Sequence, residues 1–461
     1  MPPRTVILMS DLESDSEPGP SPPVQEPPPP PPPTGTSIRR VVFLDSDSEP
    51  ESEPASIPLL QTRLPFHPPA RTLNDSLPYF RRNDIPRYLF RVYTPKSCGE
   101  TTASYVRPLS TTAPGHPEHQ RLDIFASFHP DISSRYPDRV TDSRTTAELL
   151  RRHLYFSCRP NSSSDCPFVS WSSSLLFVLR YALCRMAYYD HADDNGGEVQ
   201  PGMRTDWKDV KVILLDTTKL PRRTFISEVE LLKFFTPHET PRRSRSLERL
   251  NGLRQYHHTE GYYFGEYLSQ GDLKIAGACV QTDLHTLKAK GLFNLIPELN
   301  DEKQWGKHVV KNGGVLSLRE KLYGSSAPAT SEEPEIHQAI ELGKLFCSQQ
   351  LDLTVPAAAM FLALRKRLPH DPTMLRVFKK TFTADDIDAF QLAETNVPTE
   401  LSLPEVSQFR ILIENIQEHF DYLGYVEGQF TDGDTEEDES IDGVTDTLER
   451  LNFSLDTDDS S

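Results

Sequence analysis

Short apolar runs separated by polar, irregular segments dominate residues 84–302. Five of these runs have the length and composition of β-strands, at 88–93, 167–170, 210–216, 262–268 and 274–280. Apolar residues spaced by three or four positions predict helices at 147–155, 174–189 and 228–235. A few helices among several short strands favour an α+β fold over repeated βαβ units.

Beyond residue 334 the apolar pattern becomes helical, and it predicts helices at 335–350, 356–368, 372–382 and 404–425. The last helix is the clearest, because a single apolar stripe runs along it, formed by Val406, Phe409, Ile413, Ile416, Phe420 and Leu423. This stripe is too short for many heptads. Packing inside a small helical domain is therefore favoured over an intermolecular coiled coil.

Composition distinguishes the two ends of the chain from the middle. Residues 1–60 contain 16 of the 41 prolines, and a polyproline run is extended and buries no face. We therefore expect five segments: a disordered Pro-rich acidic tail at 1–83, an α+β domain at 84–302, a linker at 303–334, a helical domain at 335–425 and a disordered acidic tail at 426–461.

Negative charge is concentrated in the tails. Residues 1–60 carry a net charge of −7 and residues 426–461 carry −12, so of the total of −18 the segment 61–425 carries +1. This segment lacks the basic excess of a nucleic-acid surface. No apolar run reaches membrane-spanning length, and the N-terminal apolar stretch is too short for a secretory signal. We expect neither nucleic acid nor a membrane as a partner.

The six cysteines are scattered, with no C-x-x-C pair and no histidine at zinc-finger spacing. This pattern argues against a zinc site and against a disulfide framework, and it suits a reducing compartment. We expect no bound metal and an intracellular protein, either nuclear or cytoplasmic. The glycine-rich motifs of dinucleotide-binding folds and P-loops do not occur in the sequence.

Three strand-like segments each carry a polar residue suited to a pocket. They are Arg91 in Leu-Phe-Arg-Val-Tyr, Ser170 with Ser172 in Phe-Val-Ser-Trp-Ser, and Glu266 in Phe-Gly-Glu-Tyr-Leu. The serine segment leads from a strand into an apolar helix, which places hydroxyls and free N–H groups at the edge of a pocket. Each residue also has an ordinary structural explanation, as a salt-bridging arginine, a pair of capping serines and a solvated strand glutamate.

Together the three segments resemble the Arg, Ser-Thr-Ser and Glu motifs of the Arg-Ser-Glu class of ADP-ribosyltransferases. The resemblance implies a split-sheet α+β fold that uses NAD as its cofactor. In that family a glutamate faces the positive charge that develops on the ribose, and an arginine pairs with the diphosphate. The implied roles are catalysis for Glu266 and Ser170, and cofactor binding for Arg91, Ser172, Tyr262 and Tyr263.

Two positions depart from the family pattern. Members that modify arginine have an acid two residues before the glutamate, where this chain has Phe264, and Trp171 replaces the middle residue of Ser-Thr-Ser. The first departure weakens transfer to an arginine and leaves NAD hydrolysis, another acceptor or no catalysis. Residues of about 84–300 also resemble a domain of unknown function from filamentous-fungal proteins. We expect an NAD- or ADP-ribose-handling domain, and the alternative is a catalytically inert interaction protein with the same fold.

The N-terminal tail contains two copies of a pattern in which apolar residues precede alternating serine and acid. The apolar residues are Val6, Ile7 and Leu8 in the first copy and Val41, Val42 and Leu44 in the second. The pattern resembles a SUMO-interacting motif, in which an extended strand adds to a sheet edge. It implies SUMO or a SUMO-modified protein as a partner, although apolar residues also occur by chance in acidic tails.

Overall fold

The computed structural model describes residues 66–68, 77, 85–112, 123–129, 133–134, 141–155, 166–187, 205–240, 245–256, 263–305, 314–324, 327–388 and 403–430. The chain divides into two units, residues 1–55 and 56–461, and the described residues all belong to the second. The six apolar tail residues of the two repeated patterns and the expected ring residue Tyr262 lie outside the described residues. Their roles stay predictions.

Two antiparallel sheets carry the described strands. The order in the six-stranded sheet is β6 (Ile226–Ser227), β7 (Glu266–Gln270), β4 (Phe168–Ser172), β1 (Tyr88–Tyr93), β5 (Lys211–Asp216) and β9 (Cys279–Asp283). The order in the three-stranded sheet is β2 (Glu100–Thr101), β3 (Tyr105–Arg107) and β8 (Leu273–Lys274).

Both faces of the six-stranded sheet are covered, which explains the unbroken apolar run Val212 to Leu215 in β5. Along β5, Val212 and Leu214 belong to the core cluster formed with α7 (Leu175–Ala187). The alternate residues Ile213 and Leu215 pack in a cluster with the three-stranded sheet. Since successive strand residues point to opposite faces, a strand covered on both faces needs apolar residues at every position.

The six-stranded sheet divides between β1 and β4. The pairing of β1 with β5 runs over six residues, from Tyr88 opposite Asp216 to Tyr93 opposite Lys211. By contrast, β1 pairs with β4 at a single position, Phe90 opposite Ser172. The strands therefore separate after this pair, and side chains can enter between them.

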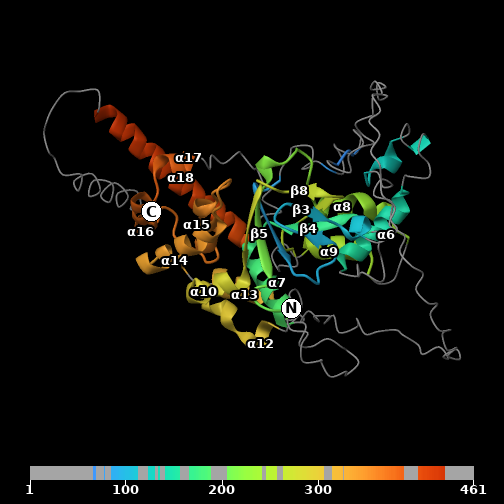
Figure 1. Cartoon of the computed structure of the whole chain (residues 1–461), viewed down its shortest axis with the longest axis horizontal. Helices are drawn as coiled ribbons and strands as arrows, with labels where there is room; N and C mark the ends of the chain where they lie inside the picture. Colours follow the sequence, from blue (N-terminus) through green and yellow to red (C-terminus); the bar gives the residue numbers. More distant parts are fainter. Residues whose placement is uncertain are drawn as a thin grey trace, which may run out of the picture. The chain divides into compact units, whose positions relative to one another are not determined.

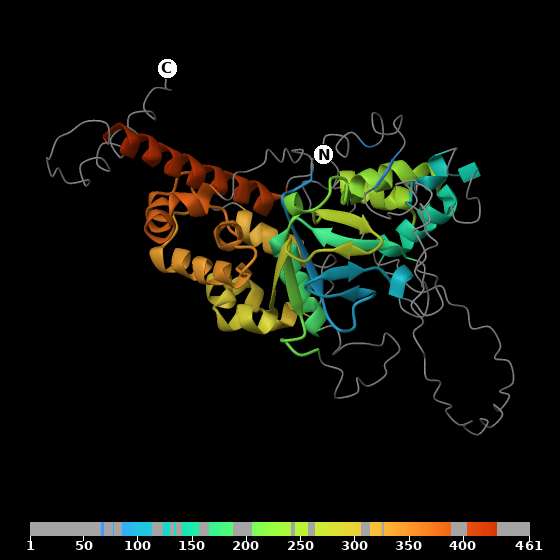
Figure 2. The same cartoon turned by 45° about the horizontal axis from the view of Figure 1, so that its top comes forward.

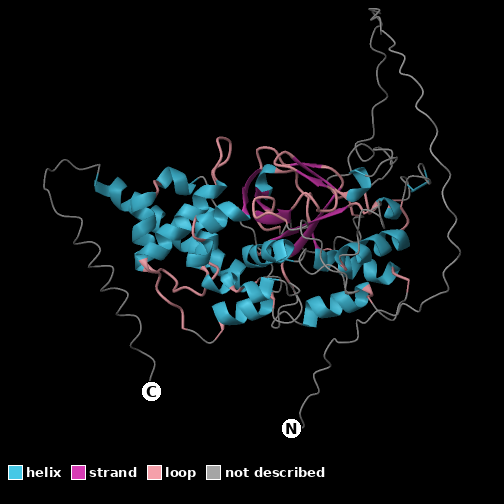
Figure 3. Cartoon of the chain, turned by 60° about the horizontal axis from the view of Figure 1, so that its bottom comes forward, coloured by secondary structure: helices cyan, strands magenta, loops and turns pink. Residues whose placement is uncertain are grey.

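Three helices cover the β7 and β4 end of the sheet. They are α6 (Ser143–Leu154), α8 (Glu228–Phe235) and α9 (Leu247–Tyr256), and their apolar residues form a second core cluster with Phe168 and Leu268. Figures 1 and 3 show the strands grouped between these helices and the C-terminal helices.

The remaining helices belong mainly to the C-terminal part. They are α4 (Leu109–Thr112), α10 (Leu284–Ala289), α11 (Leu292–Leu295), α12 (Glu302–Trp305), α13 (Val315–Tyr323), α14 (Glu333–Gly343), α15 (Thr354–Leu362), α16 (Pro372–Thr381), α17 (Ala384–Asp388) and α18 (Pro404–Phe430). Short 3-10 turns occur at Ala126–Phe128, Thr217–Lys219, Thr236–His238, Pro297–Asn300 and Lys344–Phe346. None of the described helices combines the length and apolar character needed to cross a bilayer.

The long helix α18 packs against the other C-terminal helices (Figure 2). On its stripe, Ile413, Ile416 and Phe420 are buried in the core cluster, and Phe409 is half-buried against it. The ring of Phe409 also meets the ring of Tyr88 on β1 edge to face, with centroids 6.0 Å apart. One core cluster thus extends from the six-stranded sheet to α18.

The α+β class expected from the sequence is confirmed. The expected strand 88–93 coincides with β1 and the expected helix 228–235 with α8. The expected strand 274–280 is wrong in its bounds, because a turn separates β8 from β9 there. The domain boundaries stay predictions, although the range 303–334 contains α13, whose apolar side is buried in the core.

Candidate functional site

The candidate site lies where β1 and β4 separate, and Arg91 spans this opening. Its Nη1 donates to the carbonyl oxygen of Ser170 at 2.8 Å, and its Nε donates to Thr101 Oγ1 at 3.3 Å. The guanidinium carbon lies 5.9 Å from the ring centroid of Trp171. Burial lowers the pKa of Arg91 to about 10, opposed by nearby Tyr and Cys side chains, of which Tyr181 is the most important. No carboxylate among the described residues forms an ion pair with it.

Glu266 begins β7, the strand next to β4, and its side chain is 4% exposed. Burial, and then the negative charge of Glu228, raise the pKa of Glu266 to about 8. A hydrogen bond with Ser170 and the positive charge of Arg254 act in the opposite direction. The raised pKa favours the protonated form of the Glu266 carboxyl group.

Ser170 connects the two predicted residues. Register pairs Ser172 with Glu266 and Ser170 with Leu268, so Ser170 and Glu266 are diagonal neighbours on one face of the sheet. The Ser170 hydroxyl hydrogen-bonds Glu266, whereas its carbonyl oxygen accepts from Arg91. Because successive residues of a strand point to opposite faces, the Arg91 side chain leaves β1 on the face opposite to the Ser170 hydroxyl. It reaches the Ser170 carbonyl oxygen at the opening between the two strands.

Glu228 and Arg254 are site residues that sequence reasoning missed. Glu228 is fully buried at the start of α8, and its Oε1 accepts from Arg254 Nε on α9 at 2.7 Å. Its Oε2 has no hydrogen-bond partner among the described residues, and a side-chain hydrogen bond between Glu228 and Glu266 helps to raise the pKa of Glu266. Because each of these residues looks like an ordinary charge on an amphipathic helix, no local sequence signal could have revealed them.

His153, on α6, is the second partner of Ser170. Its Nε2 lies 2.7 Å from Ser170 Oγ, and its Nδ1 lies 3.2 Å from the sulfur of Cys166. The imidazole also packs against the ring of Phe168, with centroids 5.6 Å apart. The pattern Arg151-Arg-His-Leu at the end of an amphipathic helix gave no reason to single out this histidine.

Two other predicted site residues have structural roles in the described geometry. The Ser172 hydroxyl donates to the carbonyl oxygen of Phe264 at 2.7 Å and accepts from the N–H of Ser174 at 3.0 Å. The ring of Tyr263 is 2% exposed and packs with Val229 and Leu403. Ser172 therefore joins β4 to β7, and the packing of Tyr263 leaves no open ring face for a nicotinamide.

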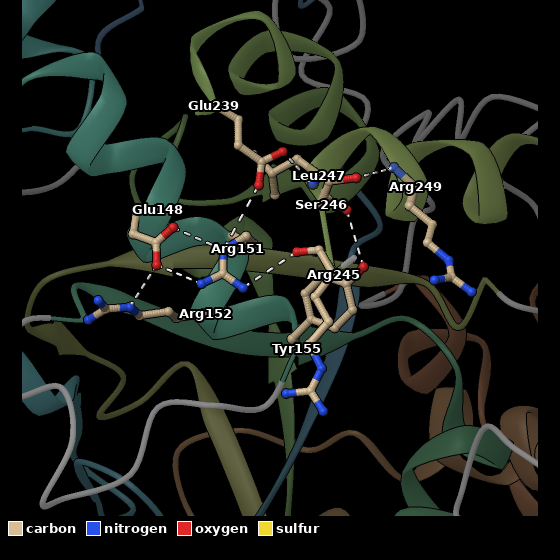
Figure 4. A network of polar contacts seen from close by, with 9 residues as sticks. All are labelled: Glu148, Arg151, Arg152, Tyr155, Glu239, Arg245, Ser246, Leu247 and Arg249. Atoms are coloured by element: carbon tan, nitrogen blue, oxygen red, sulfur yellow. Dashed lines mark hydrogen bonds and ion pairs between the residues drawn. The ribbon is translucent and has the colours of Figure 1, made fainter. Parts of the chain in front are cut away.

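A polar network joins α6 to the start of α9 (Figure 4). Arg151 donates to both carboxylate oxygens of Glu148, at 2.9 and 2.6 Å, and to the carbonyl oxygen of Arg245 at 3.4 Å. Glu239 accepts from the N–H of Leu247, the first residue of α9, at 2.7 Å. We call these residues the α6–α9 network. It holds together the two helices that supply His153 and Arg254 to the site.

A buried ion pair connects the C-terminal part to the strand that carries Glu266. Arg319 on α13 donates to Glu405 at the start of α18, with Nη2 to Oε1 at 2.7 Å, and to the carbonyl oxygen of Tyr263 at 2.9 Å. Glu405 also accepts from the hydroxyl of Ser174. Gly265 has a left-handed φ of +66°, and a side chain there would collide with Ser173 Oγ. This close approach fixes the chain immediately before Glu266.

Metal chemistry has no visible basis in the described part of the chain. No group of three or more His, Cys, Asp or Glu side chains is arranged there to hold a metal ion. No disulfide joins two of the cysteines that the structure describes. The chemistry of the site therefore rests on carboxyl, guanidinium, hydroxyl and imidazole groups.

The region that contains this geometry corresponds to a known sequence family. Residues 84–274 match the family model for a domain of unknown function (DUF7587). The match covers Arg91, Ser170 and Glu266 and ends before the C-terminal helices. No curated protein and no solved structure matches the chain. The expectation of a domain of unknown function is confirmed, and the resemblance to ADP-ribosyltransferases stays a prediction.

Proposed function

We propose that the domain binds NAD or a related ADP-ribose ligand where β1 and β4 separate. The observation that carries the proposal is Arg91, a half-buried guanidinium without a carboxylate partner among the described residues. A buried charge is costly unless it is paired, so such a position favours an anionic ligand. The planar set of N–H donors of arginine suits the oxygens of a diphosphate.

Glu266 supports the choice of NAD over a simple phosphate. Arg91 on β1 and Glu266 on β7 flank β4 and both contact its Ser170, Arg91 at the carbonyl oxygen and Glu266 at the hydroxyl. In NAD cleavage the bond between ribose C1′ and the nicotinamide nitrogen breaks, and both electrons leave with neutral nicotinamide. The oxygen of water then bonds to C1′ and releases one proton. A preorganised carboxylate facing C1′ stabilises the positive charge that develops between these events.

The raised pKa of Glu266 makes this activity dependent on pH. The carboxyl group stabilises a cation only in its charged form, which becomes the main form as the pH rises through about 8. We therefore expect nicotinamide release to increase from pH 6 through pH 8 and to level off above about pH 9. A rate that falls over this range would contradict the role given to Glu266.

One observation favours the second candidate, a catalytically inert interaction protein. Glu266 is 4% exposed and its neighbours Glu228 and Arg254 are buried beside it, so a ribose needs local movement to reach the carboxyl group. The acid that arginine-modifying relatives carry is replaced by Phe264, whose ring stacks on Phe177 with centroids 4.4 Å apart. In this candidate Glu266 and its partners are a structural polar cluster.

Calorimetric titration of the full-length protein with NAD and with ADP-ribose tests ligand binding first. We expect binding by the parent and at least tenfold weaker binding by Arg91→Met, since the diphosphate loses its cationic partner. Arg376→Met is the matched control, because Arg376 is an arginine of α16 whose side chain is 56% exposed. Absence of binding by the parent refutes the proposal.

Nicotinamide release then separates the two candidates. Glu266→Gln keeps the shape of the side chain and removes its charge, so a catalytic carboxylate predicts a loss on the order of a hundredfold or more. Binding of NAD without any release by the parent supports the inert candidate. Release by Glu266→Gln within a few-fold of the parent would exclude Glu266 as the catalytic group.

A further inference from the structure

A series of hydrogen-bonded side chains leads from α6 to Glu266. Cys166 sulfur lies 3.2 Å from His153 Nδ1, and His153 Nε2 lies 2.7 Å from Ser170 Oγ. The Ser170 hydroxyl in turn hydrogen-bonds Glu266. The first two members, Cys166 and His153, lie outside the motifs that suggested a function.

One tautomer of His153, with the proton on Nε2, gives this series a direction toward Glu266. A thiol is a weak donor and a neutral imidazole has one donor and one acceptor nitrogen. With the buried Cys166 thiol donating to Nδ1, the ring proton is on Nε2 and is donated to Ser170 Oγ. The hydroxyl then has its lone pair engaged by His153, and its own single proton is available for the carboxyl group of Glu266.

We propose that His153 is a positioning residue for Glu266: its Nε2–H donates to Ser170 Oγ and so directs the Ser170 proton to the Glu266 carboxylate. This inference deepens the proposed function and rests on it for its catalytic meaning. His153 touches neither the ligand nor the reacting bond. It acts through Ser170, whose hydroxyl rotor would otherwise have no defined direction.

The structure holds His153 firmly enough for this role. Just before it on α6, Arg151 of the α6–α9 network and Arg152 both donate to the carboxylate of Glu148 (Figure 4). The imidazole also packs against the ring of Phe168 on β4. A side chain restricted by its helix, by a ring and by two hydrogen bonds has few other orientations to adopt.

The direction of the Ser170 proton matters because the groups around Glu266 act on its charge in opposite directions. Burial and Glu228 of α8 oppose its negative charge, whereas Arg254 of α9 and the Ser170 hydroxyl of β4 favour it. Arg254 forms an ion pair with Glu228, with Nε 2.7 Å from Oε1. The hydrogen bond from Ser170 is therefore the contact most directly able to stabilise a charged Glu266.

The test compares full-length His153→Phe with His153→Gln. Phenylalanine keeps a ring against Phe168 and removes both nitrogens, whereas glutamine retains an N–H donor. Loss of a hydrogen bond to a charged group shifts the ionisation equilibrium of that group toward its neutral form by roughly tenfold or more. We expect the pH profile of nicotinamide release to shift upward by about one unit in His153→Phe, with release about tenfold slower at pH 7. His153→Gln should stay within about threefold of the parent.

His337→Phe is the matched control, since His337 lies on α14 with 56% of its side chain exposed. It should leave the pH profile unchanged. A parental profile in His153→Phe overturns the proposal. An equal loss at every pH, with no shift, also overturns it, because that result indicates only a structural role.

A second readout needs no NAD. Urea unfolding of the same variants between pH 5 and pH 9.5 reports the proton held by Glu266, because the free energy of unfolding falls until the folded protein releases it. In His153→Phe the pH at which this fall ends should be about one unit higher. If the parent neither binds nor cleaves NAD, the proposed function fails and this readout alone decides the role of His153. If His153→Phe does not fold, Cys166→Ala replaces it. We expect a smaller shift of the pH dependence in the same direction, and the absence of any shift would contradict the proposal.

Discussion

The carboxyl group of Glu266 should make the stability of the folded protein depend on pH. Its pKa is raised to about 8 in the folded state, above the ordinary glutamate value of 4.5. Below pH 4.5 the group is protonated in both the folded and the unfolded chain. Between pH 4.5 and pH 8 only the unfolded chain releases the proton, so the free energy of unfolding falls as the pH rises. Above pH 8 both forms are charged and the fall ends.

The size of this effect follows from the width of the window. A full proton difference changes the free energy of unfolding by about 1.4 kcal/mol for each pH unit. Over the window for Glu266 the parent should lose about 3–5 kcal/mol relative to a variant that does not titrate. Glu266→Gln is that variant, because its neutral amide resembles the protonated acid and can still donate to Glu228.

Urea unfolding at pH 5 and pH 8.5 measures the difference. The parent and Glu266→Gln should have similar stability at pH 5, and Glu266→Gln should be the more stable protein at pH 8.5. Glu414→Gln is the control, since Glu414 lies on α18 with its side chain 49% exposed and should keep the parental pH dependence. The reasoning is refuted if the parent and Glu266→Gln lose the same stability between the two pH values.

Three further predictions concern the rest of the chain. Glu405→Ala leaves the Arg319 charge buried without its partner and should destabilise the protein by about 3–5 kcal/mol in urea unfolding. Glu333→Ala, which removes the exposed pair with Arg376, should change stability by less than about 1 kcal/mol. Equal losses in the two variants would contradict the expectation that the buried pair matters more. Ile413→Ala should cost roughly 2–5 kcal/mol, since Ile413 is 2% exposed, and an unchanged midpoint would contradict its place in the core. A peptide of residues 39–53 should bind SUMO at micromolar affinity or weaker, and alanine in place of its apolar residues should abolish binding in an NMR titration; retained binding would show that the acidic residues alone attract SUMO.

Elements that depend on local pattern were predicted well. The strand 88–93 and the helix 228–235 have the expected bounds because apolar side chains recur at the periods of a strand and a helix. The helix expected at 404–425 begins at Pro404 and extends to Phe430. The expected strand at 262–268 was placed too early, because Gly265 has a backbone conformation that a strand does not continue.

The candidate site was predicted only in part. Arg91, Ser170 and Glu266 each stand in an apolar segment, and a polar residue in such a segment is visible in the sequence. Glu228, Arg254 and His153 stand on amphipathic helices, where polar residues are ordinary. Their importance depends on which helix packs over which strand, and the spacing of residues along the chain does not contain that information.

The sequence by itself determined the α+β class, the apolar strands and helices, and three polar residues worth examining. These properties follow from side-chain chemistry and from the periods of local structure, which act over a few residues. Only the tertiary structure decided that β1 and β4 separate beside Ser170, that Glu228 is buried against Glu266, and that His153 reaches Ser170 from α6. Each of these depends on contacts between distant segments, and the free energy of a buried charge or hydrogen bond depends on all the groups that surround it.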